Sequence, residues 1–203
     1  IERMAANDPM LGQAIAEAVT RHRELRAEMG DFLKLDEAEQ LAQVQAGFVN
    51  FYPDDAISPY LPATARGPWI ITLKGAVVHD NGGYGMLGFG HNDPAILEAL
   101  SRPQVMANVM APSVAQLRFT AALNKELGRN RDSNPYARYM CLNSGSESVS
   151  LACRIADVNA KLMTDAGGRY AGRTIKRLAV KGAFHGRTDK PALYSDSSRK
   201  VYQ

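Results

Sequence analysis

The sequence lacks the features that mark secreted, metal-binding and membrane-spanning proteins. Its 203 residues include only two cysteines, Cys141 and Cys153, and no C-x-x-C or clustered His/Cys spacing. Neither a disulfide framework nor a metal site is therefore expected, and both cysteines are predicted to be small buried apolar residues. No apolar run approaches the ~20 residues of a membrane span, and the first residues do not resemble a signal peptide.

A strong charge of either sign is also missing. The formal net charge is +3, with 45% hydrophobic and 22% charged residues. So small a charge gives no reason to expect binding to nucleic acid or to an acidic membrane. The length suits one good core or part of a larger one, and we expect a cytoplasmic protein, with an organelle matrix as the alternative.

The first residues have the pattern of two helices. Asp8 followed by Pro9 predicts the start of a helix that carries an apolar stripe and ends at Gly30. Asp36 and Glu39 have the spacing of a capping box at the start of a second helix. We expect this pair to be an appendage or an interface element without chemistry.

The next part of the chain alternates between breakers and short elements. Several prolines exclude a regular helix and a central strand from residues 48–68, so an irregular segment is expected there. Residues 69–73 and 76–78 predict a hairpin. Residues 93–101 and 113–128 predict two helices, because each segment begins with a capping residue.

Gly83 to Gly88 fits the pattern G-x-G-x-x-G by its letters. A dinucleotide site needs that motif to open a helix, with an acidic residue about 20 positions later at a strand end. Here the next helix begins only at Asp93, and no such acid follows. We interpret residues 82–90 as a flexible loop that lines a site or an interface, and His91 as a turn or interface residue.

A strand–helix–strand pattern fills the last third of the sequence and predicts an α/β fold. The apolar residues 139–142 precede a small polar turn, a helix follows it to about Met163, and residues 175–180 predict the next strand. This spacing is typical of a βαβ unit with parallel strands and a right-handed crossover. Both strands would then end at the edge of the sheet where open α/β sheets bind ligands.

The two turns at that edge differ in chemistry. Ser144 to Ser146 lie at a helix N-terminus, whose unpaired N–H groups suit a phosphate. Phe184 and His185 offer a flat ring and an imidazole, so a ligand with a phosphate at one end and a ring at the other would satisfy both turns. The alternatives are an ordinary serine cap for the first turn and core packing of Phe184 for the second.

Four segments in order resemble the class III aminotransferases, the ornithine, acetylornithine and 4-aminobutyrate branch of the pyridoxal-phosphate enzymes of fold type I. The resemblance covers roughly residues 69–194. The segments are Lys74-Gly75 to Asp80, the Gly-rich residues 82–94, Asn143-Ser144-Gly145-Ser146-Glu147 and Phe184-His185-Gly186-Arg187-Thr188.

The resemblance implies a three-layer α/β/α large domain with a mainly parallel sheet, here incomplete, after a helical and small-domain segment. We expect residues 1–68 to be an N-terminal helical extension and irregular lead-in. Residues 69–105 would be a small-domain or interface segment with the Gly-rich loop, and residues 106–203 would be the first part of the cofactor-binding domain.

It further implies pyridoxal 5'-phosphate as the cofactor and five residues that bind it. Gly145 and Ser146 would hold the phosphate, with Ser144 close by. Phe184 would lie against the pyridine ring, and His185 would shape the pocket beside it.

The family's Schiff-base lysine, and its aspartate on the pyridine nitrogen, lie well after the Phe-His-Gly segment. We therefore expect both beyond Gln203, which makes this chain an N-terminal piece without a catalytic residue of its own.

The implied activity is transfer of an amino group from an amino acid or amine donor to a keto-acid acceptor. The resemblance also implies a homodimer, with residues 82–90 as the segment that reaches the partner's site. One alternative is another class III activity, an aminomutase, racemase or decarboxylase. The other is a non-catalytic module that binds a phosphate ligand.

Overall fold

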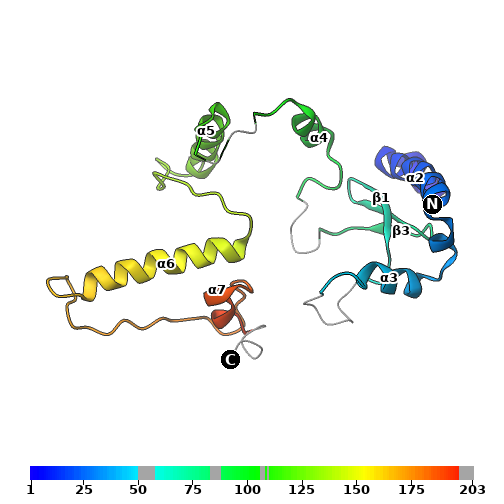
Figure 1. Ribbon diagram of the computed structural model, residues 1–203. Helices are drawn as coiled ribbons and strands as arrows, with labels where there is room; N and C mark the ends of the chain where they lie inside the picture. The colour runs from blue at the N-terminus through cyan, green and yellow to red at the C-terminus, as the bar shows by residue number, and fades with distance from the viewer. Residues whose placement is uncertain (50–57, 83–87, 106–107, 109, 197–203) are drawn as a thin grey trace. The chain divides into compact units, whose positions relative to one another are not determined.

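The chain folds into two compact units. The computed structural model describes residues 1–49, 58–82, 88–105, 108 and 110–196. The units are Ile1–Met106 and Ala107–Gln203 (Figure 1). The three-part division expected from the sequence stays a prediction.

The first unit combines helices with a small sheet. Its described elements are α1 (Glu2–Asn7), α2 (Pro9–Lys34), α3 (Glu37–Gln45), β1 (Pro62–Arg66), β2 (Trp69–Thr72), β3 (Val77–His79) and α4 (Pro94–Ser101). The predicted start of α2 is confirmed, because the Asp8 carboxylate accepts from the N–H groups of Met10 and Leu11. The predicted Asp36–Glu39 capping box at the start of α3 is also confirmed.

Helix α2 is longer than the sequence predicted. It passes the expected stop at Gly30 and ends at Lys34, with a kink at Met29, whose φ is −141° and ψ is 50°. Gly30 does not adopt the left-handed conformation that ends many helices, so the chain resumes helical geometry after the kink.

The sheet of the first unit is antiparallel, in the order β1-β2-β3. The predicted hairpin is confirmed as β2 and β3, which pair Ile71 with Val77. The expectation of an irregular segment was wrong at β1, which pairs with β2. Pro62 is the first residue of this edge strand, a position where the missing N–H interrupts no ladder.

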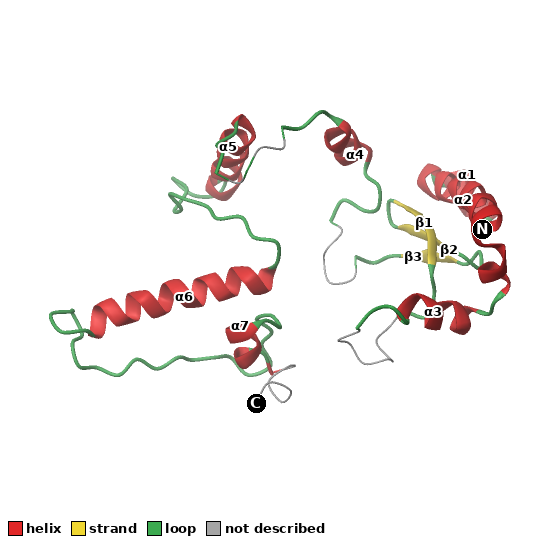
Figure 2. Cartoon of the chain, in the orientation of Figure 1, coloured by secondary structure: helices red, strands yellow, loops and turns green. Residues whose placement is uncertain are grey.

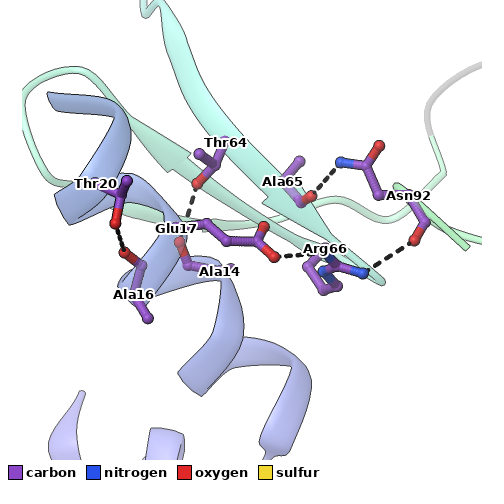
Figure 3. Close-up of polar contacts among 8 residues, drawn as sticks. All are labelled: Ala14, Ala16, Glu17, Thr20, Thr64, Ala65, Arg66 and Asn92. Carbon is purple, nitrogen blue, oxygen red and sulfur yellow. Dashed lines mark hydrogen bonds and ion pairs between the residues drawn. The ribbon is translucent and has the colours of Figure 1, made fainter. Parts of the chain in front are cut away.

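Helix α2 packs against this sheet through a small core, and polar contacts fix its position. Leu11, Ala14 and Ala18 of α2 are buried together with Ile71 of β2. In Figure 3 the Thr64 hydroxyl donates to the carbonyl oxygen of Ala14, at 3.0 Å. The same view shows Arg66 of β1 in an ion pair with Glu17 of α2, and in contact with Asn92 (Figure 3).

The capping residue of α2 also ties this helix to β2, which makes the first unit sensitive to acid. The indole N–H of Trp69 donates to Asp8 at 2.7 Å, and this bond is the main reason why the pKa of Asp8 is lowered from its ordinary value. A lowered pKa in the folded state stabilises the fold above the pKa of an unfolded aspartate, and that contribution is lost as the pH falls through the lower folded value.

We therefore expect Asp8→Asn to lower the thermal unfolding temperature at neutral pH and to have little effect under strongly acidic conditions. Unfolding curves of both proteins across the acidic range measure the difference. A difference that stays constant with pH would contradict this explanation.

The second unit is helical in its described residues. Its elements are α5 (Val114–Gly128), α6 (Gly145–Thr164) and α7 (Asp189–Tyr194). The predicted capping box of Ser113 and Gln116 starts α5, and the helix ends at Gly128 as expected. After α6 the chain turns and returns as an extended segment to α7, which packs against α6 (Figure 1).

The predicted βαβ unit is not formed in the described part of the chain, and this expectation was wrong. Residues 139–142 and 175–180 are extended but belong to no ladder, and Figure 2 draws strands only at β1, β2 and β3. A strand needs a hydrogen-bonded neighbour, and neither segment has one. Apart from the half-buried Tyr139, their apolar side chains are exposed, and Leu178 is 99% accessible.

The absence of a packed sheet beside α6 also changes the environment of the cysteines. Cys141 is exposed and Cys153 is only partly buried, so the prediction that both are buried was wrong. Both thiols are free.

Candidate functional site

The start of α6 is built by a reciprocal capping box. Ser144 is the N-cap residue, and its hydroxyl accepts from the N–H of Glu147 at 3.2 Å. The Glu147 carboxylate accepts in return from the N–H groups of Asn143 and Ser144, at 2.8 and 3.1 Å. Three of the backbone donors around the helix start are therefore satisfied within the chain.

Two donors remain at the same end. In the part of the chain that the structure describes, the N–H groups of Gly145 and Ser146 have no hydrogen-bond partner. Apart from its chain neighbours and the backbone of its own helix turn, no atom lies within 4 Å of the position that a Cβ on Gly145 would occupy. These two N–H groups and the Ser146 hydroxyl, which we call the α6 anion site, lie at the positive end of a 20-residue helix.

The second predicted turn lies directly against this site. We call residues 184–187 the Phe184 loop. The N–H of Arg187 donates to the Ser146 hydroxyl oxygen at 3.2 Å. A Cβ on Gly186 would lie 2.5 Å from that oxygen, so the two backbones are in van der Waals contact. The structure thus brings Ser146 and the Phe184 loop together, although the parallel strands expected to place them are not formed.

The side chains of the Phe184 loop differ in exposure. Phe184 is 60% exposed, and the guanidinium carbon of Arg187 lies 5.5 Å from its ring centroid, a cation–π distance. The core-packing alternative for Phe184 therefore does not describe this structure. His185 is half-buried, and its backbone N–H donates to the hydroxyl of Ser195 at 2.7 Å.

Sequence reasoning missed Ser195. Its side chain is fully buried and bonded to the Phe184 loop, yet no local motif identifies it as different from the other serines nearby. Its role depends on a contact ten positions back along the chain, which a pattern search does not reveal.

The Gly-rich segment of the first unit is described only at its ends, since residues 83–87 lie outside the described residues. His91 pairs with Asp80, with 2.8 Å between its Nε2 and a carboxylate oxygen. Asp93 caps α4, and residues 88–92 before it are not helical. The Gly-rich motif therefore does not open a helix with its last glycine, as a dinucleotide site requires.

Other kinds of site find no support among the described residues. They contain no group of three or more His, Cys, Asp or Glu side chains able to hold a metal ion. None of their helices is long and apolar enough to cross a membrane.

Taken together, the contacts describe a candidate phosphate site at the start of a helix, in contact with a loop that carries an exposed aromatic ring. The family model described as "Aminotransferase class-III" matches residues 52–202, well over half of the chain. The chain therefore belongs to the class III aminotransferases, a family of pyridoxal-phosphate-dependent enzymes of fold type I. No curated protein and no solved structure matches the chain significantly.

Proposed function

We propose that this chain contributes the phosphate-binding part of a pyridoxal-phosphate-dependent aminotransferase, which moves an amino group from an amino acid or amine to a keto acid. One observation carries the proposal. The α6 anion site and the Phe184 loop touch each other at Ser146 and Gly186, so a single phosphorylated aromatic molecule can reach both.

The residues present fit the phosphate of this cofactor. The free N–H groups of Gly145 and Ser146 supply two donors, and the helix start adds a favourable field for an anion. The Ser146 oxygen already accepts from Arg187, which leaves its hydroxyl proton free to be donated to a phosphate oxygen. The Ser144 hydroxyl is used in the cap, so Ser144 would support the site by holding the helix start.

The Phe184 loop fits the ring of the cofactor. Phe184 is exposed enough for its ring to stack on the pyridine ring, and His185, beside it in the chain, would border the pocket. When bound, pyridoxal phosphate supplies the aldehyde that takes up the amino group and the electron sink that makes proton removal possible. The residues of this chain hold and orient it.

The proposal includes the features that the family resemblance implied for the whole enzyme. These are a homodimer, a cytoplasmic location, and a reactive lysine contributed from sequence after Gln203. Light scattering of the full-length protein measures whether it is a dimer.

The test is a titration of the full-length protein with pyridoxal phosphate, with pyridoxal as the control ligand that lacks only the phosphate. We expect the long-wavelength absorption band of a lysine-bound cofactor, abolished by borohydride. The phosphate is expected to tighten binding on the order of a hundredfold, because two or more hydrogen bonds to a charged group are lost with pyridoxal.

Each outcome has a different meaning. Phosphate-dependent binding without the absorption band would favour the non-catalytic module, and equal binding of both ligands would contradict the α6 anion site. With a loaded enzyme, product analysis with amino donors and keto acids separates transamination from racemisation, decarboxylation and amino-group migration.

A further inference from the structure

The backbone of the Phe184 loop and of the two residues before it forms hydrogen bonds with two residues that follow α7. Ser195 is fully buried. Its hydroxyl oxygen accepts from the N–H of His185 at 2.7 Å, and the same oxygen lies 2.9 Å from the carbonyl oxygens of both Gly186 and Pro191, to which the hydroxyl donates. One hydroxyl therefore binds both the N–H of His185 and the carbonyl oxygen of Gly186, which are consecutive residues of the loop.

Asp196 binds the two residues immediately before the Phe184 loop. Its backbone N–H donates to the carbonyl oxygen of Ala183 at 3.1 Å, and its carboxylate accepts from the N–H of Gly182. We call Ser195 and Asp196 the clasp. Between them they bind backbone groups of four residues on one short segment, two donors and two acceptors.

The clasp takes the place of a strand partner for this segment. Residues 182–186 belong to no ladder, so their backbone polar groups need other partners wherever water is excluded. Gly186 is buried between the clasp on one side and Ser146 on the other. The position of the loop against the α6 anion site is therefore set by a chain of contacts that runs from Ser195 through Gly186 to Ser146.

Helix α7 also has contacts with α6 that do not involve the Ser195 hydroxyl. Lys190 of α7 pairs with Asp157 of α6, and Asp157 also pairs with Arg177. The Lys190–Asp157 pair joins α7 to α6 without the Ser195 hydroxyl, so we expect the loss of that hydroxyl to release the loop and leave the two helices packed.

We propose that Ser195, assisted by Asp196, is a positioning residue that fixes the Phe184 loop against the α6 anion site and so tunes cofactor binding. The second half of this statement rests on the proposed function. In this role the Ser195 hydroxyl acts on backbone groups of the loop, and it takes no part in the chemistry.

The experiment compares four substitutions in the full-length protein by two readouts. Ser195→Ala and Ser195→Val remove the hydroxyl, whereas Ser195→Thr keeps the hydroxyl on a side chain with about the volume of valine. Thr164→Val is the control, because it removes a hydroxyl hydrogen bond at the far end of α6. The first readout is amide hydrogen exchange in residues 182–187. The second is the dissociation constant for pyridoxal phosphate.

We expect alanine and valine to raise exchange of the His185 amide and to weaken cofactor binding about tenfold, as expected for loss of a buried hydrogen-bond partner. Threonine is expected to restore both, and Thr164→Val to change neither. The threonine–valine comparison removes the effect of volume, and exchange in α6 reports whether a variant has lost its fold.

Unchanged exchange at His185 in Ser195→Ala would overturn the proposal, and so would a valine variant that behaves like threonine. Faster exchange with an unchanged dissociation constant would overturn the link to the cofactor. If the wild-type protein does not bind pyridoxal phosphate, the proposed function fails, while the exchange comparison still decides whether the clasp holds the loop.

Discussion

Replacement of Gly186 by alanine is expected to weaken cofactor binding on the order of a hundredfold, because overpacking and an unfavourable φ each cost ~1–3 kcal/mol. The added Cβ would lie 2.5 Å from the Ser146 oxygen and 2.9 Å from its Cα. The φ of Gly186 is +123°, which an alanine rarely adopts. The Phe184 loop must therefore move away from the α6 anion site to accept one methyl group.

The matched control is Gly172→Ala. Gly172 also has a positive φ, +75°, but no atom lies within 4 Å of its Cβ position. This control carries the backbone strain without the collision. Pyridoxal phosphate titrations of both variants separate the two effects. A Gly186→Ala protein that binds the cofactor as tightly as Gly172→Ala would show that the contact with Ser146 does not matter.

Replacement of Gly145 by leucine is expected to cause a large loss of cofactor binding with no loss of stability. Gly145 begins α6, its φ is not positive, and its Cβ position is open, so the fold accepts a side chain there. The same open space is where a phosphate would meet the two free N–H groups. Leucine also has a better helix propensity than glycine, by up to ~1 kcal/mol in a helix interior.

The measurements are the dissociation constant for pyridoxal phosphate, expected to rise at least about tenfold with the loss of hydrogen bonds to a charged group, and the denaturant midpoint of unfolding. Gly30→Leu is the control, because Gly30 is a glycine of α2 with equally open surroundings. It should leave cofactor binding unchanged. Parallel losses of binding and stability in Gly145→Leu would instead identify Gly145 as a structural cap residue.

Helix starts were predictable from the sequence because their causes are local. Asp36 with Glu39, and Ser113 with Gln116, satisfy backbone donors three residues away, so the pattern contains the whole explanation. The hairpin of β2 and β3 was predictable for the same reason, because a short turn joins its two strands. The end of α2 was less predictable, because Gly30 permits a helix to stop but does not require it.

The strands of the second unit could not be predicted in the same way. Residues 139–142 and 175–180 have apolar strand composition. A ladder also needs a neighbouring strand, and the composition of a segment does not indicate which strand that is. For the candidate site, the cap at Ser144 could be predicted from Glu147 three positions on. The clasp could not, since Ser195 acts on His185 through the folded chain alone.

The unpaired segment at residues 175–180 has a consequence for handling the protein. Leu178 is 99% accessible and Val180 75%, and residues 175–179 offer backbone donors and acceptors that no other described residue takes up. Such an apolar edge is a template on which a second chain can add a strand. Self-association through this edge should therefore limit the solubility of the isolated polypeptide, and a lysine in place of Leu178 is the change most suited to relieve it.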